Sequence, residues 1–246
     1  MKHRLLGIDC ATEDAKIGVA YGELTTNGLA VYEARQCSRE NSVIETTISW
    51  LAQDNFPTLL AIDAPLGWPV ALSVSLVKHL AGDEIATEPN TMFRRCTDHF
   101  IQEKIGKTPL DVGADRIART AHSALTLLGA LRRRLRCEIP LAWSLDDCAR
   151  ISAIEVYPAA TLRAHSINAS GYKKKSNLAE RDAIIEHLRS HTSFPENIEA
   201  IRESSDALDA VVCLVAGGDF LRGLAMPPAD LALAKQEGWI WVCSMA

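Results

Sequence analysis

The sequence predicts an α/β domain built on a mixed sheet, with an antiparallel three-strand meander followed by parallel strands. Three strand-like segments come first, at 4–9, 15–21 and 29–36, and short turn-rich stretches separate them. Segments this close leave no room for crossover helices, so they are expected to pair as antiparallel neighbours. A run with helical spacing over 42–52 then precedes a continuous apolar run at 59–63, as a buried parallel strand requires.

This order of meander, helix and buried strand is characteristic of the ribonuclease H-like layout, with flanking helices. We therefore expect a single domain over residues 1–246, with a mainly helical insertion at about 65–145. The other expected elements are helices over 71–79 and 114–136, a strand over 151–157, a helical pattern within 173–190, a helix over 205–221 and a closing strand over 238–242.

The composition indicates a cytoplasmic globular protein. No apolar run approaches the roughly 18–20 residues that cross a bilayer, so no membrane association is expected. The net charge of −5 argues against a broad basic surface for nucleic acid, although basic residues are bunched at 94–95, 132–136 and 173–175.

The cysteines and histidines give little sign of a metal site. The seven cysteines are scattered and form no C-x-x-C pair, which favours free thiols in a reducing compartment. The seven histidines are isolated in the sequence, and we expect His99, His122 and His187 at the surface or in packing roles.

Several acidic residues lie at the ends of apolar segments or within them, positions that are unusual for solvent-exposed acids. Asp9 and Asp63 each end an apolar run, Glu155 lies inside an apolar strand, and Asp206 and Asp209 share one face at the start of a helix. Adjacent parallel strands would bring Asp9 and Asp63 together at the edge where open α/β sheets bind ligands. Clustered carboxylates persist mainly around a divalent cation, and Mg²⁺ accepts such oxygen ligands.

Each acid also has a purely structural interpretation. Asp9 and Asp63 could form turns, and Glu155 could point outward from a half-exposed strand. Asp206 lies in a first helical turn, where an acid favours the helix dipole, whereas Asp209 lies deeper. The set of acids in this order is therefore stronger evidence than any one of them.

Six blocks of the chain together resemble domain-of-unknown-function family 429, which is described as predicted ribonuclease H-like nucleases. The blocks lie at 7–9, 61–67, 94–98, 155–159, 205–210 and 237–242. The resemblance implies that the family's acids fall on Asp9, Asp63, Glu155 and Asp209. It implies further that substrate is bound by Arg94, Arg95, Thr97, Asp98, Tyr172 and Lys173.

Three functions remain as hypotheses. The first is a metal-dependent nuclease, in which Asp9, Asp63 and Asp209 hold Mg²⁺ or Mn²⁺ and nucleic acid or a nucleotide is the substrate. The second is an actin-like or sugar-kinase-like phosphotransferase, which normally needs two such domains and glycine-rich phosphate loops. The third is a non-catalytic nucleotide- or nucleic-acid-binding module. Assembly as a homo-oligomer is compatible with all three.

Overall fold

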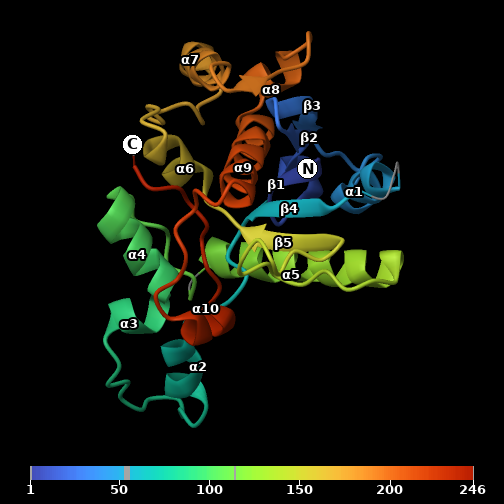
Figure 1. Cartoon of the computed structure of the whole chain (residues 1–246). Helices are drawn as coiled ribbons and strands as arrows, with labels where there is room; N and C mark the ends of the chain where they lie inside the picture. The colour runs from blue at the N-terminus through green and yellow to red at the C-terminus, as the bar shows by residue number, and fades with distance from the viewer. Residues whose placement is uncertain (1, 53–55, 114, 246) are drawn as a thin grey trace.

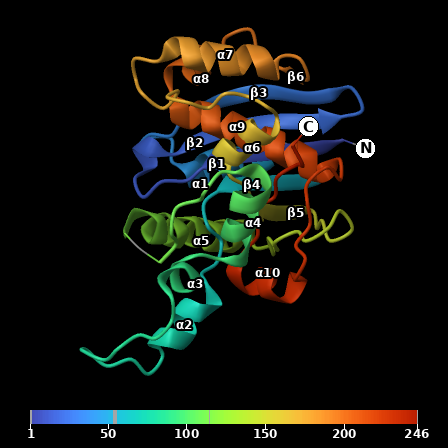
Figure 2. The ribbon, with the colours of Figure 1, turned by 90° about the vertical axis from the view of Figure 1, so that its left-hand side faces the viewer.

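A mixed six-stranded sheet forms the centre of the molecule, which a computed structural model describes over residues 2–52, 56–113 and 115–245. The strands lie in the order β5-β4-β1-β2-β3-β6, of which Figure 1 labels β1 to β5 and Figure 2 also β6. Their bounds are β1 His3–Asp9, β2 Gly18–Thr25, β3 Gly28–Gln36, β4 Thr58–Asp63, β5 Ile151–Glu155 and β6 Thr192–Ser193. The first three strands pair antiparallel, whereas β4 and β5 extend the sheet in parallel, which confirms the expected fold class.

Helices flank this sheet and fill the long connections. Their bounds are α1 Val43–Leu51, α2 Val70–Leu76, α3 Pro89–Phe93, α4 Cys96–Ile105, α5 Asp115–Leu135, α6 Pro158–Ala164, α7 Leu178–Leu188, α8 Glu199–Glu203, α9 Ser205–Leu221 and α10 Leu231–Glu237. Figure 2 looks onto the face of the sheet that α9 and α6 cover. Among the described residues, no helix combines the length and the apolar character needed to cross a bilayer.

The alternation of side chains along β1 divides the core into two layers. Leu5 packs with α9 in one cluster, and Leu6 packs with α1 and α5 in another. In the sequence, helices α2 to α5 lie between β4 and β5. Of these, α5 packs against the sheet as part of the core, and α2 projects away from it (Figure 2).

Two glycines allow α9 to lie directly on the sheet. A Cβ atom built on Gly7 would come within 2.0 Å of the Ala210 carbonyl oxygen, and one on Gly18 within 1.8 Å of the Asp206 carbonyl oxygen. Any larger residue at either position would push the helix away. The close approach brings the first turns of α9 to the strand ends where Asp9 lies.

The expected closing strand over 238–242 is wrong. The segment makes isolated bridges, from Ile240 to Glu155 and from Cys243 to Ala225, and no continuous ladder. Its residues Trp239 to Val242 are buried. A short apolar run is as typical of a buried segment without strand pairing as of a strand, which explains the error.

Candidate functional site

Asp9 and Asp63 lie side by side at the carboxyl ends of two neighbouring strands. β1 and β4 pair in parallel register, and the last pair of that register is Asp9 with Asp63. The fully buried side chain of Asp209 comes from α9 on the adjoining layer. The three carboxyl groups are close enough for their charges to interact.

The three acids are costly to ionise together. Burial raises the pKa of Asp9 well above its usual value, and the charges of Asp209 and Asp63 raise it further. Burial likewise raises the pKa of Asp63 to about 7, although a hydrogen bond from Asp9 opposes the shift. Burial also raises the pKa of Asp209, which Lys173 counteracts. The site therefore favours the addition of positive charge.

Tyr172 and Lys173 contact the two oxygens of Asp209. The Tyr172 hydroxyl donates to Asp209 Oδ1 over 2.5 Å, and Lys173 Nζ lies 2.7 Å from Asp209 Oδ2. Burial opposes the charge on Lys173, but the three aspartates raise the pKa of its ammonium group overall. Lys173 thus serves as a built-in counter-charge for the aspartates.

Arg181 of α7 fixes the loop that carries these two residues. Its buried guanidinium donates to the carbonyl oxygens of Tyr172, Lys174 and Lys175, and also to that of Arg202. A single side chain therefore connects the loop to the start of α7 and to α8.

Glu155 belongs to a second buried network beside the aspartates. Its carboxylate pairs with Arg95 at 2.8 Å and accepts from the Leu66 backbone at 2.9 Å. Both carboxylate oxygens of Asp98 accept hydrogen bonds from the same guanidinium, at 3.1 Å and 2.9 Å. These contacts fix the turn after β4, next to Asp63.

The remaining predicted substrate-binding residues have partners within the protein. Arg94 donates to Asp111 at 2.9 Å, and the Thr97 hydroxyl accepts from the Ile240 backbone at 2.8 Å. Arg95, Thr97 and Asp98 are buried, and their contacts are structural. Of the predicted set, the structure places Tyr172 and Lys173 beside the aspartates.

A cavity of about 640 Å³ opens next to Asp63. Its lining includes Tyr157, Tyr172, Glu155, Arg95 and three lysines, Lys107, Lys173 and Lys174. The sequence offered no sign of Lys107, which belongs to no motif, whereas Tyr157 lies within the block at 155–159 but was assigned no role. The volume lies within the range of small-molecule sites.

The aspartates supply the hard oxygen donors that Mg²⁺ and Mn²⁺ prefer. They form a loose set, with one Asp209 oxygen occupied by Lys173. Over the described ranges, the one group with three ligand atoms all within 4.8 Å of one another is His165, Asp219 and Cys243. The aspartates therefore suit a cation by donor type, and closing around it would draw Asp209 away from Lys173.

Comparison with known proteins gives a family match without an activity. The model of a family described as "Protein of unknown function (DUF429)" matches residues 7–232. Comparison with curated proteins finds no match.

Proposed function

The chain belongs to the DUF429 family, and from its carboxylate site we propose that it is a metal-dependent phosphodiesterase acting on nucleic acid or a nucleotide. The observation that carries the proposal is that Asp9 and Asp63, at the carboxyl ends of β1 and β4, lie close to Asp209 of α9. Burying several acids at one point costs folding energy, and a divalent cation is the usual compensation.

Asp9, Asp63 and Asp209 would hold Mg²⁺ or Mn²⁺. Such a cation supplies positive charge against a phosphate ester and makes water easier to deprotonate. Tyr172 orients Asp209 through its short hydrogen bond. In the absence of a cation Lys173 opposes the rise that burial causes in the pKa of Asp63 and Asp209. Its side chain is 59% exposed, so it can turn toward a phosphate when one binds.

The cavity lysines would receive the rest of the substrate. Lys107 and Lys174 line the same cavity as Lys173, and Tyr157 adds an aromatic wall. Positive side chains position the phosphates that flank the scissile bond, and an aromatic ring can stack on a base. Arg95, Asp98 and Glu155 act as positioning residues that fix the turn beside Asp63.

A nucleotide phosphotransferase is the second candidate, and the size of the cavity favours it. A volume of about 640 Å³ suits one nucleotide better than a duplex. Against it, the sequence has no glycine-rich phosphate loop of the G-x-x-x-x-G-K-[ST] type. A binding module without catalysis is the third candidate.

One assay separates these functions. The full chain is incubated with labelled single- and double-stranded DNA and RNA, and with nucleoside triphosphates with and without an acceptor, in Mg²⁺, Mn²⁺ or chelator. We expect metal-dependent cleavage of a phosphodiester that Asp63→Asn abolishes. Asp206→Asn is the control, because Asp206 lies on the same helix as Asp209 but accepts a hydrogen bond from Gln36 at the surface.

Three results would contradict the proposal. Transfer of phosphate from a triphosphate to an acceptor would favour the phosphotransferase. Binding of a polymer that chelator leaves unchanged, with no cleavage, would favour a binding module. Cleavage that persists in Asp63→Asn would place the chemistry elsewhere.

A further inference from the structure

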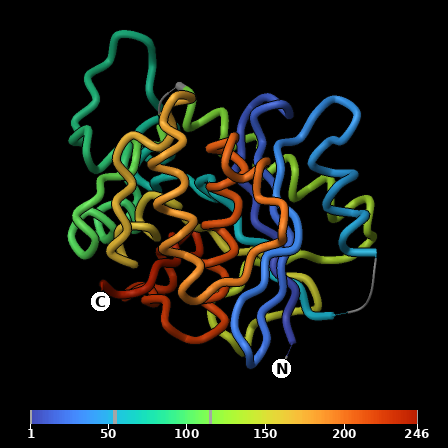
Figure 3. The backbone as a smooth tube through the Cα atoms, turned by 90° about the horizontal axis from the view of Figure 1, so that it is seen from above, coloured from blue at the N-terminus to red at the C-terminus, as the bar shows by residue number. Residues whose placement is uncertain are grey.

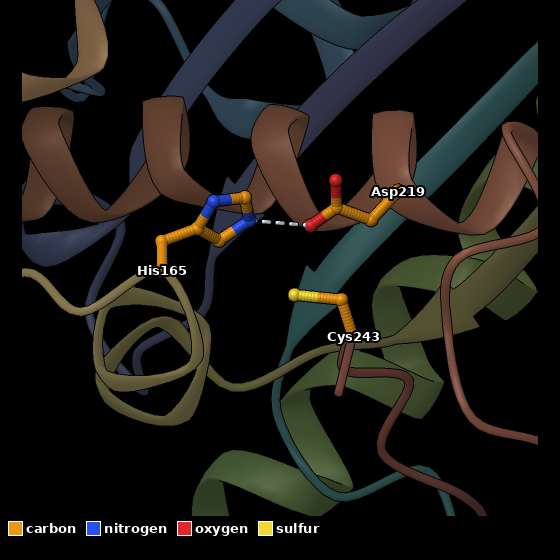
Figure 4. Close-up of side chains that lie close together, drawn as sticks. All are labelled: His165, Asp219 and Cys243. Atoms are coloured by element: carbon orange, nitrogen blue, oxygen red, sulfur yellow. Dashed lines mark hydrogen bonds and ion pairs between the residues drawn. The ribbon is translucent and has the colours of Figure 1, made fainter. Parts of the chain in front are cut away.

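His165, Asp219 and Cys243 meet at the far end of α9 from the aspartates. One ligand atom from each of the three lies within 4.8 Å of the other two. His165 Nε2 lies 2.7 Å from Asp219 Oδ2, and Figure 4 shows the Cys243 thiol reaching toward the same part of the imidazole. Asp209 and Asp219 are ten residues apart on one helix, or about 15 Å along its axis.

Three separate segments hold these side chains in place. His165 caps the C-terminus of α6, where Ser166 adopts a left-handed conformation with φ of 59° and ends the helix. Asp219 lies in the last turns of α9. Cys243 is fixed by its bridge to Ala225 in the C-terminal segment. Figure 3 shows that segment running beside the chain around 160–175.

The cluster is enclosed but accessible at its edge. The side chain of Asp219 is 2% exposed and that of His165 21%. Cys243 is buried. Two cationic or titratable neighbours face the cluster: Arg222 Nη1 lies 3.7 Å from Asp219 Oδ1, and the His191 ring stacks on His165 at 5.5 Å.

We propose that His165, Asp219 and Cys243 form a binding site for Zn²⁺, separate from the carboxylate site. Imidazole, carboxylate and thiolate are the ligands that Zn²⁺ uses in proteins, at about 2.0–2.3 Å. The three ligand atoms now lie within 4.8 Å of one another, and small rotations of the side chains would bring each of them to such a distance from one shared ion. A carboxylate and a thiolate together also balance the charge of a divalent cation.

The donor types distinguish this site from the first one. A thiolate and an imidazole select Zn²⁺ over Mg²⁺, whereas a set of carboxylates selects Mg²⁺ or Mn²⁺. Three protein ligands leave a fourth position for water, which enters at the exposed edge of His165. Bound Zn²⁺ would tie the C-terminal segment to α6 and α9.

A cysteine–histidine–aspartate nucleophile is the other arrangement of the same residues. In that arrangement the aspartate and the thiol contact opposite nitrogens of the imidazole. Here Asp219 contacts Nε2, and Cys243 approaches from the same side (Figure 4). Convergence on one point is the geometry of a chelate.

The test uses the full chain after dialysis against a chelator. Zn²⁺ is titrated in competition with a colorimetric zinc indicator, and Co²⁺ is then added to metal-free protein as a spectroscopic probe. We expect one Zn²⁺ per chain, a higher melting temperature with Zn²⁺, and a thiolate-to-cobalt charge-transfer band. The cobalt band needs no variant, so it tests the thiolate ligand even if a substitution unfolds the chain.

Variants locate the binding. Cys243→Ser should remove the charge-transfer band and weaken Zn²⁺ binding by at least about tenfold, which is the lower range for loss of even an outer partner. Cys148→Ser is the thiol control, and Asp63→Asn is the control for the carboxylate site; both should retain the band and the affinity.

The opposite results would overturn the proposal. Absence of a cobalt–thiolate band in the wild-type chain would leave the cluster as an ion pair with a neighbouring thiol. Equal Zn²⁺ affinity in Cys243→Ser, or loss of it in Asp63→Asn alone, would assign the metal to the aspartates instead.

Discussion

Arg181 Nη1 donates a hydrogen bond of 2.6 Å to the carbonyl oxygen of Tyr172, and this contact connects the interior of α7 to the candidate site. Tyr172 in turn donates to Asp209. The position of the Asp209 carboxylate therefore depends on a buried guanidinium that contacts no acid of the site. The same guanidinium donates to the carbonyl oxygens of Lys174 and Lys175, so it holds the loop at 172–175 against α7.

Replacing Arg181 with methionine should loosen this loop and destabilise the protein. The four carbonyl oxygens that it satisfies would lose a charged donor, and such hydrogen bonds contribute about 1.5–3 kcal/mol each. We expect a loss of at least about 2 kcal/mol in the free energy of unfolding, measured by urea denaturation. Arg202→Met is the control, because Arg202 pairs with Asp182 at the surface; an equal loss in that variant would contradict the assignment.

The metal-free protein should become less stable as the pH rises. Burial raises the pKa of Asp63 from 3.8 in the unfolded chain to about 7 in the folded one. The folded state therefore binds more protons between these values, and its stability falls from about pH 4 to about pH 7. Urea midpoints measured in chelator across this window should show the fall, and Asp63→Asn should flatten it. A rise in stability over the same window would mean that Asp63 is ionised and paired.

Asp9→Asn should separate stability from function at the same site. An amide in place of the carboxyl group removes a repelling charge and can still donate to Asp63. We expect an unchanged or higher melting temperature, together with loss of metal-dependent cleavage. A large fall in melting temperature would instead identify Asp9 as a structural turn residue.

Hydrophobic periodicity was sufficient to predict most strands of the sheet and the long helix α9 that packs on it. The helix expected over 205–221 is α9, Ser205–Leu221. β2 begins at Gly18, later than the expected 15, because Asp14–Lys16 forms a short 3-10 turn. Such turns carry no periodic signal, so the boundary could not be predicted.

The site was predictable where strand order determines it and not where distant segments meet. Asp9 and Asp63 are placed by the ends of β1 and β4, which the apolar runs indicate. The cluster of His165 with Asp219 and Cys243 joins residues far apart in the sequence, and the sequence assigned His165 no role. Spacing along the chain carries no information about such a contact.

Arg95 should behave as a residue of the core. Arg95→Met would leave Glu155 and Asp98 buried without their partner, and breaking such an ion pair costs about 3–5 kcal/mol. We expect that loss in the free energy of unfolding. Arg94→Met, which affects a partly exposed pair with Asp111, should change stability by under about 1 kcal/mol. Similar small effects from both variants would show that Arg95 is not the centre of a buried network.

Lys173 should govern the binding of phosphates. Lys173→Met removes a cation that lies against Asp209 and lines the cavity, so oligonucleotide or nucleotide affinity should fall. The slope of log affinity against log salt should decrease by about 1, as loss of one phosphate contact requires. Lys175→Met is the matched control from the same loop, since Lys175 is not among the residues that line the cavity. Fluorescence anisotropy in chelator and in Mn²⁺ measures both quantities. If the slope stays constant in Lys173→Met and falls in Lys175→Met, the phosphates bind on the outer side of the loop, away from the aspartates.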